Sequence, residues 1–217
     1  ERLQQAAQSE EVIAITRPED IQQKRVLKDA DSHTWTFHAS QVPDFAFAVS
    51  PSYIWDATSV QVAPGKRVEV SAVYPKGADF DQVAEISRES IRMLSEEIIG
   101  VPFAFPKLTA FNGSGGMEFP MMINDGDAGY AATVHVTSHE IGHNYFPFYV
   151  MTNESYYAFM DEGLVSFLPR EVEKALVDGA EPFADIIRRY ARGAGSMREV
   201  PLMMRSYAIS DYQAYRI

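Results

Sequence analysis

The stretch HVTSHEIGHNYF, residues 135–146, carries two histidines four positions apart, with a glutamate directly after the first of them. On a helix, residues i and i+4 share one face and lie about 6 Å apart along the axis, so His139 and His143 can both point a ring nitrogen at one ion. Glu140 lies roughly 100° around the helix, where its carboxylate can reach a metal-bound water without taking a coordination position. The sequence therefore predicts a zinc site with Glu140 as general base.

A further histidine stands one turn earlier, at position 135. Eight residues of helix climb roughly 12 Å, whereas two ligands of one zinc ion lie only about 4 Å apart, so His135 and His143 cannot share the ion. We expect His135 to be packed against the fold or to support the site from outside the ligand set.

A catalytic zinc ion takes three protein ligands and keeps one position open. No histidine follows His143 and the chain has no cysteine, so the third ligand should be a carboxylate. Glu162 is the best placed, because a turn containing proline can fold its segment back against the first helix, with Phe159 and Val165 to bury there. We expect Asp161 and Glu154 to be solvated. The other nearby carboxylates are Glu171 and Glu173.

Composition narrows the class of protein. The chain has 217 residues, of which 46% are hydrophobic, enough for one large domain or for one domain and part of another. A formal net charge of -11 argues against a nucleic-acid partner, because phosphate binding needs clustered basic residues. No apolar run approaches the roughly 20 residues of a membrane helix. The compartment stays open, since an exported or periplasmic and a cytoplasmic location both fit.

Local patterns predict strands first and helices later, which is typical of an α+β fold. Short alternating runs predict strands over 11–16, 33–39, 44–50, 68–74, 107–111 and 117–123. Between the third and the fourth of these, VAPGKR (62–67) is the best candidate for a domain boundary. A helix is expected over 79–100, capped by Asp79 and stopped at Gly100, with an apolar stripe along Val83, Ile86, Ile91, Leu94 and Ile98. Further helices are expected over 131–146, 154–168, 170–179 and 183–192.

These motifs together resemble the aminopeptidase N family of gluzincins. Eighteen residues separate His143 from Glu162, which is the spacing of that family, and TNESYYAFMDEGLVSF (152–167) is similar to its second ligand helix. GSGGMEF (113–119) resembles the family's glycine-x-Met-Glu-Asn signature, the strand along which a peptide N-terminus is held. WTFHASQVPDFAFAVS (35–50) resembles the end of the family's N-terminal β domain.

The resemblance implies a domain organisation. Residues 66–217 would form a thermolysin-like zinc peptidase catalytic domain, truncated at its C-terminal side. Residues 1–65 would be the C-terminal part of an N-terminal β domain. The chain starts with ERLQQAAQSE and stops at SDYQAYRI, so we expect a fragment or processed chain that lacks N- and C-terminal parts of the full-length enzyme.

The resemblance also implies roles for individual residues. One Zn²⁺ ion would be bound by His139, His143 and Glu162, with Glu140 activating the water. Glu118 would pair with the free α-amine of the substrate, a role that agrees with the attraction of a carboxylate for an ammonium group. The adjoining backbone of Gly115, Gly116 and Met117 would pair with the substrate in β fashion.

The family also uses a tyrosine to stabilise the oxyanion. Its spacing selects Tyr212, and Tyr215 and Tyr207 are alternatives in the same segment, SYAISDYQAYRI (206–217). An ordinary packed tyrosine fits the segment almost as well.

The function implied is that of a zinc aminopeptidase acting on peptides. Phe119 stands where the family has an asparagine, which favours a rival interpretation, a zinc endopeptidase or another zinc hydrolase on the same scaffold. A second rival is a non-catalytic interaction module that keeps the fold. The presence of Glu140 weighs against this module, because binding alone does not need a general base.

Overall fold

The computed structural model describes residues 1–23, 31–113, 115–197 and 199–209. Its centre is a six-stranded mixed sheet in the order β1-β2-β3-β4-β6-β5. Strands β1, β2 and β3 are antiparallel neighbours, β4 and β6 continue in parallel, and β5 returns antiparallel at the edge. The strands are β1 (Ile13–Thr16), β2 (Ile54–Ala63), β3 (Lys66–Tyr74), β4 (Lys107–Asn112), β5 (Met117–Phe119) and β6 (Met122–Asp125).

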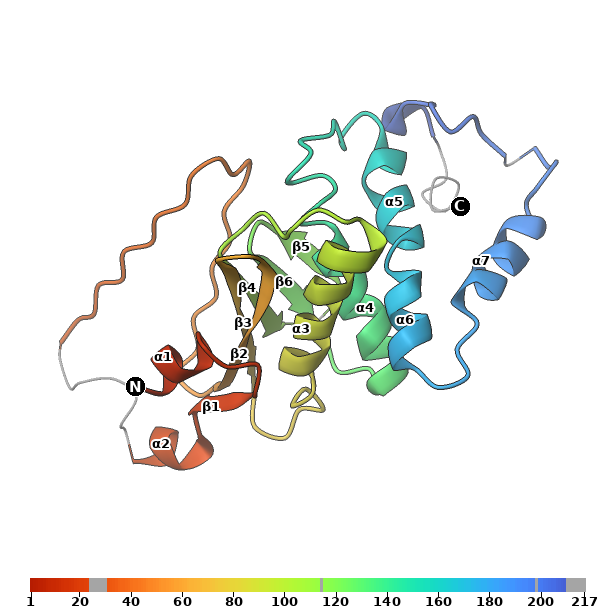
Figure 1. Cartoon of the computed structure of the whole chain (residues 1–217). Helices are drawn as coiled ribbons and strands as arrows, with labels where there is room; N and C mark the ends of the chain where they lie inside the picture. The colour runs from red at the N-terminus through yellow and green to blue at the C-terminus, as the bar shows by residue number, and fades with distance from the viewer. Residues whose placement is uncertain (24–30, 114, 198, 210–217) are drawn as a thin grey trace.

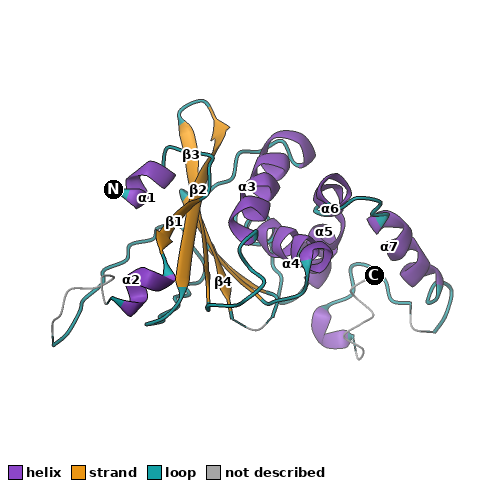
Figure 2. Ribbon diagram, turned by 90° about the horizontal axis from the view of Figure 1, so that it is seen from below, coloured by secondary structure: helices purple, strands orange, loops and turns teal. Residues whose placement is uncertain are grey.

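Helices lie on both sides of the sheet. Figure 2 shows α3 and α4 on one side, with α5, α6 and α7 beyond them, and α1 and α2 on the other side. The helices are α1 (Arg2–Ala6), α2 (Pro18–Gln22), α3 (Val83–Met93), α4 (Tyr130–Gly142), α5 (Glu162–Phe167), α6 (Arg170–Leu176) and α7 (Pro182–Ala191). In the described residues, no helix is long and apolar enough to cross a membrane. The α+β fold class predicted from the sequence is confirmed.

Helix α3 buries the apolar stripe that the sequence predicts, mostly against the sheet and in part against α4 and α6. Val83, Ile86, Ile91 and Leu94 are buried. The expected cap at Asp79 is wrong, because α3 begins only at Val83. The preceding turn instead carries Phe80 into the core against Tyr74, with the two ring centroids 5.7 Å apart. After Met93 the helix widens into a π-helical turn, Leu94–Ile98. Gly100, which follows this turn, has a left-handed backbone conformation.

The strands expected over 33–39 and 44–50 are not formed in the described structure. Their alternating aromatic residues are exposed, with Trp35 at 55% and Phe37 and Phe47 each at 70% of full exposure. In Figure 1 this segment (orange) stands away from the sheet. The alternation is real, but a strand also needs a neighbouring strand for its backbone hydrogen bonds, and sequence alone does not supply one.

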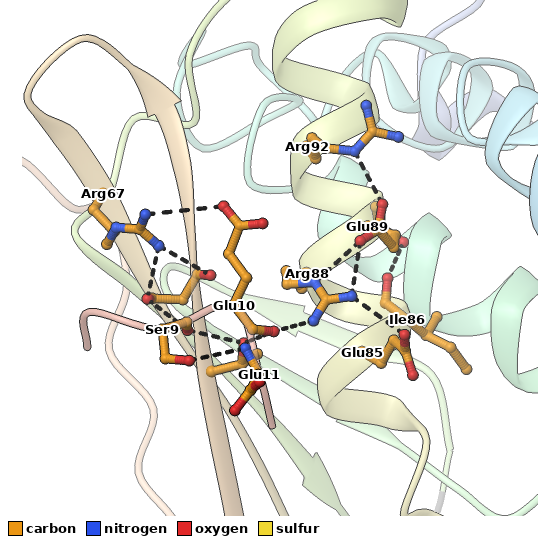
Figure 3. A network of polar contacts seen from close by, with 12 residues as sticks. Ser9, Glu10, Glu11, Arg67, Glu85, Ile86, Arg88, Glu89 and Arg92 are labelled. Carbon is orange, nitrogen blue, oxygen red and sulfur yellow. Dashed lines mark hydrogen bonds and ion pairs between the residues drawn. The ribbon is translucent and has the colours of Figure 1, made fainter. Parts of the chain in front are cut away.

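The expected boundary near residue 65 falls in a β-hairpin. Strand β2 pairs with β3 along most of its length, and Gly65 makes the turn with a positive φ of 74°. The N-terminal segment is attached to the same sheet, because Ser59 N donates to Ser9 O at 2.9 Å. Figure 3 shows how Arg67 from β3 and Arg88 from α3 both reach this N-terminal segment. The division into residues 1–65 and 66–217 stays a prediction.

Candidate metal centre

Helix α4 carries His139, has His143 as its C-cap residue, and is fixed to the sheet by polar contacts. Thr137 Oγ1 donates a hydrogen bond to Asp125, the last residue of β6, at 2.7 Å. Just after the helix, Asn144 Oδ1 accepts from the backbone N–H of Met121 at 2.9 Å. Both contacts are made from the sheet side of α4, so the opposite face of its C-terminal half is left for α5.

Helix α4 ends at Gly142, earlier than the expected residue 146, and Gly142 marks the approach of α5. A Cβ atom at this position would lie 3.1 Å from Val165 Cγ1 and 3.2 Å from Pro169 Cγ. These distances are tighter than nine in ten real Cβ contacts. The missing side chain therefore allows α5 to pack closely enough for its backbone to reach the histidines.

Both imidazole rings are oriented by backbone carbonyls. His139 Nδ1 lies 3.1 Å from Val165 O, and His143 Nδ1 lies 3.0 Å from Phe146 O. A carbonyl oxygen only accepts, so in each neutral ring the hydrogen belongs on Nδ1 and the lone pair on Nε2. The ring centroids are 5.0 Å apart with the planes at 87°. This arrangement is the usual second layer of contacts behind histidine ligands of zinc.

The atoms that would face an ion lack other partners. His143 Nε2 and Glu140 Oε2 are buried and make no hydrogen bond to any described residue. Potential ligand atoms of His139, Glu140 and His143 lie within 4.8 Å of one another. Buried polar atoms normally have a partner, so two such atoms side by side point to a ligand between them. Two imidazole nitrogens with nearby carboxylates are donors that fit zinc.

Glu162 lies on the other side of this arrangement. It is the first residue of α5, and its Oε2 atom lies 3.4 Å from His139 Nε2. The structure thus places Glu162 beside His139. Among the described residues, the groups whose potential ligand atoms all lie within 4.8 Å of one another are His139 with Glu140 and His143, and Glu118 with His143 and Asp161. Whether they bind an ion is taken up below as a proposal.

The predicted helix over 154–168 is interrupted. It consists of a 3₁₀ turn, Ala158–Met160, followed by α5. Tyr156 O accepts from Ser206 N at 2.9 Å, and Ala158 N donates to Ser206 Oγ at 3.3 Å. Backbone groups that a continuous helix would use internally are thus bonded to a segment about fifty residues later, which local sequence patterns cannot reveal.

Asp161 is not solvated, contrary to the prediction. It is only 8% exposed, and its Oδ1 atom lies 2.5 Å from His143 Nδ1. The contact puts a carboxylate directly behind one of the two histidines. The only signal in the sequence is that Asp161 precedes Glu162, and this spacing alone does not say which way its side chain turns.

Glu118 comes to the site from the edge strand β5. Potential ligand atoms of Glu118, His143 and Asp161 lie within 4.8 Å of one another. Gly116, two residues before Glu118, lies against the predicted base. A Cβ atom on Gly116 would lie 2.4 Å from Glu140 Oε1. Of the other predicted substrate contacts, Met117 is 45% exposed and Gly115 has a φ of 148°, while Phe119 ends the strand.

Crowded carboxylates set the electrostatics of the site. Burial raises the pKa of Glu140 to about 9, and the charge of Glu118 adds to the increase while that of His143 opposes it. Burial also raises the pKa of Glu118. Burial lowers the pKa of His143, but the hydrogen bond to Asp161 and the surrounding carboxylates outweigh burial and raise it to about 9. A divalent cation would relieve this accumulation of negative charge.

His135 stands apart from the ligand set, as predicted. Its Nδ1 atom lies 2.8 Å from Glu173 Oε1, and the same carboxylate accepts two hydrogen bonds from Arg170. The structure does not test the predictions for the catalytic tyrosine. Tyr212 and Tyr215 lie outside the described residues, and Tyr207 is 68% exposed.

Solved structures share this fold, whereas no protein-family model and no curated protein sequence matches the chain. An M1 zinc metallopeptidase from Deinococcus radiodurans aligns with a TM-score of 0.58 and 18% identity, over 76% of this chain and 38% of that one. A variant of it bound to a Tyr-Ser-Ala substrate aligns over the same shares, with a TM-score of 0.55 and 18% identity.

A two-domain M1 zinc metallopeptidase variant bound to L-tryptophan gives a TM-score of 0.57 at 17% identity, again over 76% of this chain and 38% of that one. At such identities the likeness establishes a common fold. The chain spans 38% of the length of these proteins.

Proposed function

We propose that the chain is the catalytic part of a zinc metallopeptidase, and more narrowly of an aminopeptidase that removes N-terminal residues from peptides. The observation that carries the proposal is the pair of buried, unpartnered atoms, His143 Nε2 and Glu140 Oε2, beside a second histidine whose Nδ1 is held by a carbonyl. The M1 zinc metallopeptidase fold of the neighbours supports it.

In this proposal, His139, His143 and Glu162 hold one Zn²⁺ ion. When bound, zinc supplies a Lewis acid and lowers the pKa of a water molecule. Glu140 takes a proton from the attacking water on its carboxylate and later passes it to the leaving amine. The orientation of each histidine by a backbone carbonyl fixes which nitrogen faces the ion.

The proposed substrate contacts lie on β5. As the edge strand of the sheet, β5 offers a backbone along which an extended peptide can add in β fashion, and Gly115, Gly116 and Met117 belong to the segment that enters it. Glu118, next to His143, would pair with the α-ammonium of the first residue and so place the first peptide bond near Glu140. A bound Tyr-Ser-Ala peptide in a structural neighbour supports peptides as the substrate class.

The remaining parts of the proposal concern the rest of the enzyme. We place the oxyanion-stabilising tyrosine at Tyr212, with Tyr215 as the alternative. We also retain the division into the end of an N-terminal β domain, residues 1–65, and a thermolysin-like catalytic domain, residues 66–217. The exposed aromatic residues of the 33–49 segment support the first assignment, since a neighbouring β domain would bury them.

The test is a metal and activity measurement on the full-length enzyme. The expected result is one zinc per chain, lost on chelation together with peptide hydrolysis and restored by zinc, with release of N-terminal residues from unblocked peptides. Substituting His139, His143 or Glu162 by Ala should abolish stoichiometric zinc. Cleavage within N-acetylated peptides would favour the endopeptidase, and zinc binding without any hydrolysis would favour the non-catalytic module.

A further inference from the structure

Asp161 occupies a position where an aspartate usually has another task. It is the N-cap residue of α5, and an N-cap aspartate normally accepts a hydrogen bond from the backbone of the first helical turn. Here the side chain makes no capping bond. Its carboxylate is turned inward instead, with Oδ1 at 2.5 Å from His143 Nδ1.

The contact is made on one side of the imidazole ring only. Nδ1 of His143 faces Asp161 and the carbonyl oxygen of Phe146, whereas Nε2 on the other side is buried without a partner among the described residues. Nδ1 and Nε2 point away from opposite sides of the imidazole ring, so a carboxylate next to Nδ1 does not contact an ion bound at Nε2 of the same ring. Asp161 is therefore placed behind the histidine, outside the coordination sphere.

Burial makes this orientation significant. A carboxylate that is 8% exposed is costly unless it is paired, and its close partner is His143 Nδ1 at 2.5 Å, which also contacts the carbonyl oxygen of Phe146. A carboxylate behind a histidine ligand fixes the ring orientation and makes the ligand nitrogen more basic. The other histidine, His139, has the neutral carbonyl of Val165 at the corresponding nitrogen. The two histidines are thus supported differently.

We propose that Asp161 is a positioning residue, which holds the imidazole of His143 through Nδ1 and thereby strengthens zinc binding at Nε2. The inference rests on the proposed zinc site. Its rival is that Asp161 itself is the third ligand in place of Glu162. The geometry favours Glu162, because its Oε2 atom lies on the Nε2 side of His139, at 3.4 Å.

The experiment measures zinc affinity by competition with a chromophoric chelator, using Asp161→Ala, Asp161→Asn and the parent in the full-length enzyme. Asp161→Ala should weaken zinc binding by about 10- to 100-fold, as is usual when the partner of a histidine ligand is removed. Asp161→Asn should weaken it less, because the amide keeps an oxygen beside Nδ1 of His143 but carries no charge. Circular dichroism checks that each variant is folded, and Asp161→Asn decides should Asp161→Ala fail to fold.

A matched control is available on the next helix, α6. Glu173→Gln removes the carboxylate beside His135, which is not a proposed ligand, and keeps an oxygen for Arg170. It should leave zinc affinity unchanged. An equal loss in this control and in the Asp161 variants would mean that a general change in charge, rather than positioning, controls affinity, and would overturn the proposal.

Cobalt substitution separates positioning from ligation. With Co²⁺ in place of zinc, the absorption spectrum of the Asp161 variants should keep the band pattern of the parent, whereas Glu162→Gln should change it. A changed coordination number in Asp161→Ala would make Asp161 a ligand. Zinc affinity within twofold of the parent in both folded Asp161 variants would also refute the inference and would leave the zinc peptidase proposal intact. A parent protein that binds no zinc would overturn both.

Discussion

A methyl group added at Gly116 should displace the proposed general base without disturbing the fold. In Gly116→Ala, the new Cβ would lie 2.4 Å from Glu140 Oε1, whereas ordinary contact begins at 3.4 Å. The carboxylate oxygen must therefore retreat by about 1 Å, the difference between these distances. The next neighbours of the new atom, Glu140 Cδ at 3.4 Å and Val136 Cγ1 at 3.6 Å, already have room.

A misplacement of about 1 Å in a catalytic group can cost on the order of 100-fold in rate. We therefore expect Gly116→Ala to lower kcat by about 10- to 100-fold while zinc content and the thermal midpoint stay close to those of the parent. A matched control is Gly163→Ala, next to Glu162. The added Cβ would meet Phe159 Cβ at 3.5 Å, an ordinary contact, and alanine favours the helix.

The assay is steady-state hydrolysis of an unblocked dipeptide amide by the full-length enzyme, with zinc content and thermal unfolding measured on the same samples. A Gly116→Ala enzyme with parental kcat would show that Glu140 does not act from the position seen here. Equal losses of kcat in Gly116→Ala and Gly163→Ala would show that any added atom near the site lowers turnover. The contact between residue 116 and Glu140 would then not explain the loss.

Three further substitutions test separate groups. Glu140→Gln should keep zinc and abolish hydrolysis, because an amide takes no proton from water; a variant with near-parental turnover would refute the assignment. Glu118→Gln should lower kcat/KM for free-amine peptides by tenfold or more, at about 1.4 kcal/mol per decade, and should bring it closer to kcat/KM for N-acetylated peptides. An unchanged ratio of kcat/KM between the two kinds of peptide would contradict the amine-binding role. Burial raises the pKa of Asp125 from 3.8 to about 6, so the stability that protonated Asp125 contributes is complete below about pH 4 and is lost as pH rises through about 6. Asp125→Asn keeps an acceptor for Thr137 and should remove this pH dependence. In urea unfolding, the free energy of unfolding of the parent should fall by on the order of 3 kcal/mol relative to that of the variant between about pH 4 and pH 7. Parallel pH profiles of stability for parent and variant would contradict this prediction.

The fold could be predicted wherever burial decides local structure. The period of Val83, Ile86 and Ile91 predicts the face that α3 buries, because Val83 and Ile91 pack into the core with the sheet and Ile86 packs with Val134 of α4 and Val172 of α6. Sequence patterns fail to predict local structure where contacts with a distant part of the chain determine it. Aromatic alternation over 33–49 does not specify a neighbouring strand, and the 154–168 helix is broken by bonds to Ser206.

The candidate site divides in the same way. The spacing of His139 and His143 follows from one helix, so the sequence predicts that they share a face, and the structure places their rings side by side. The scarcity of other donors predicts Glu162 as the third ligand, and the structure places it beside His139. The contact of Asp161 with His143 was missed because a helix N-cap residue can turn its side chain toward the helix or away from it, and the choice depends on α4, which packs from elsewhere in the chain.

The two glycines of the site should differ in what their substitution destroys. At Gly116 the atom that yields is the end of a flexible Glu140 side chain, so the base moves and the ligands stay. At Gly142 the neighbours are Val165 and the ring of Pro169, at 3.1 to 3.2 Å, and both are stiff. Gly142→Ala should therefore push α5 outward and carry Glu162 with it, weakening zinc binding measurably in chelator competition, whereas Gly116→Ala should impair turnover alone. Parental zinc affinity in Gly142→Ala would show that α5 does not hold a ligand.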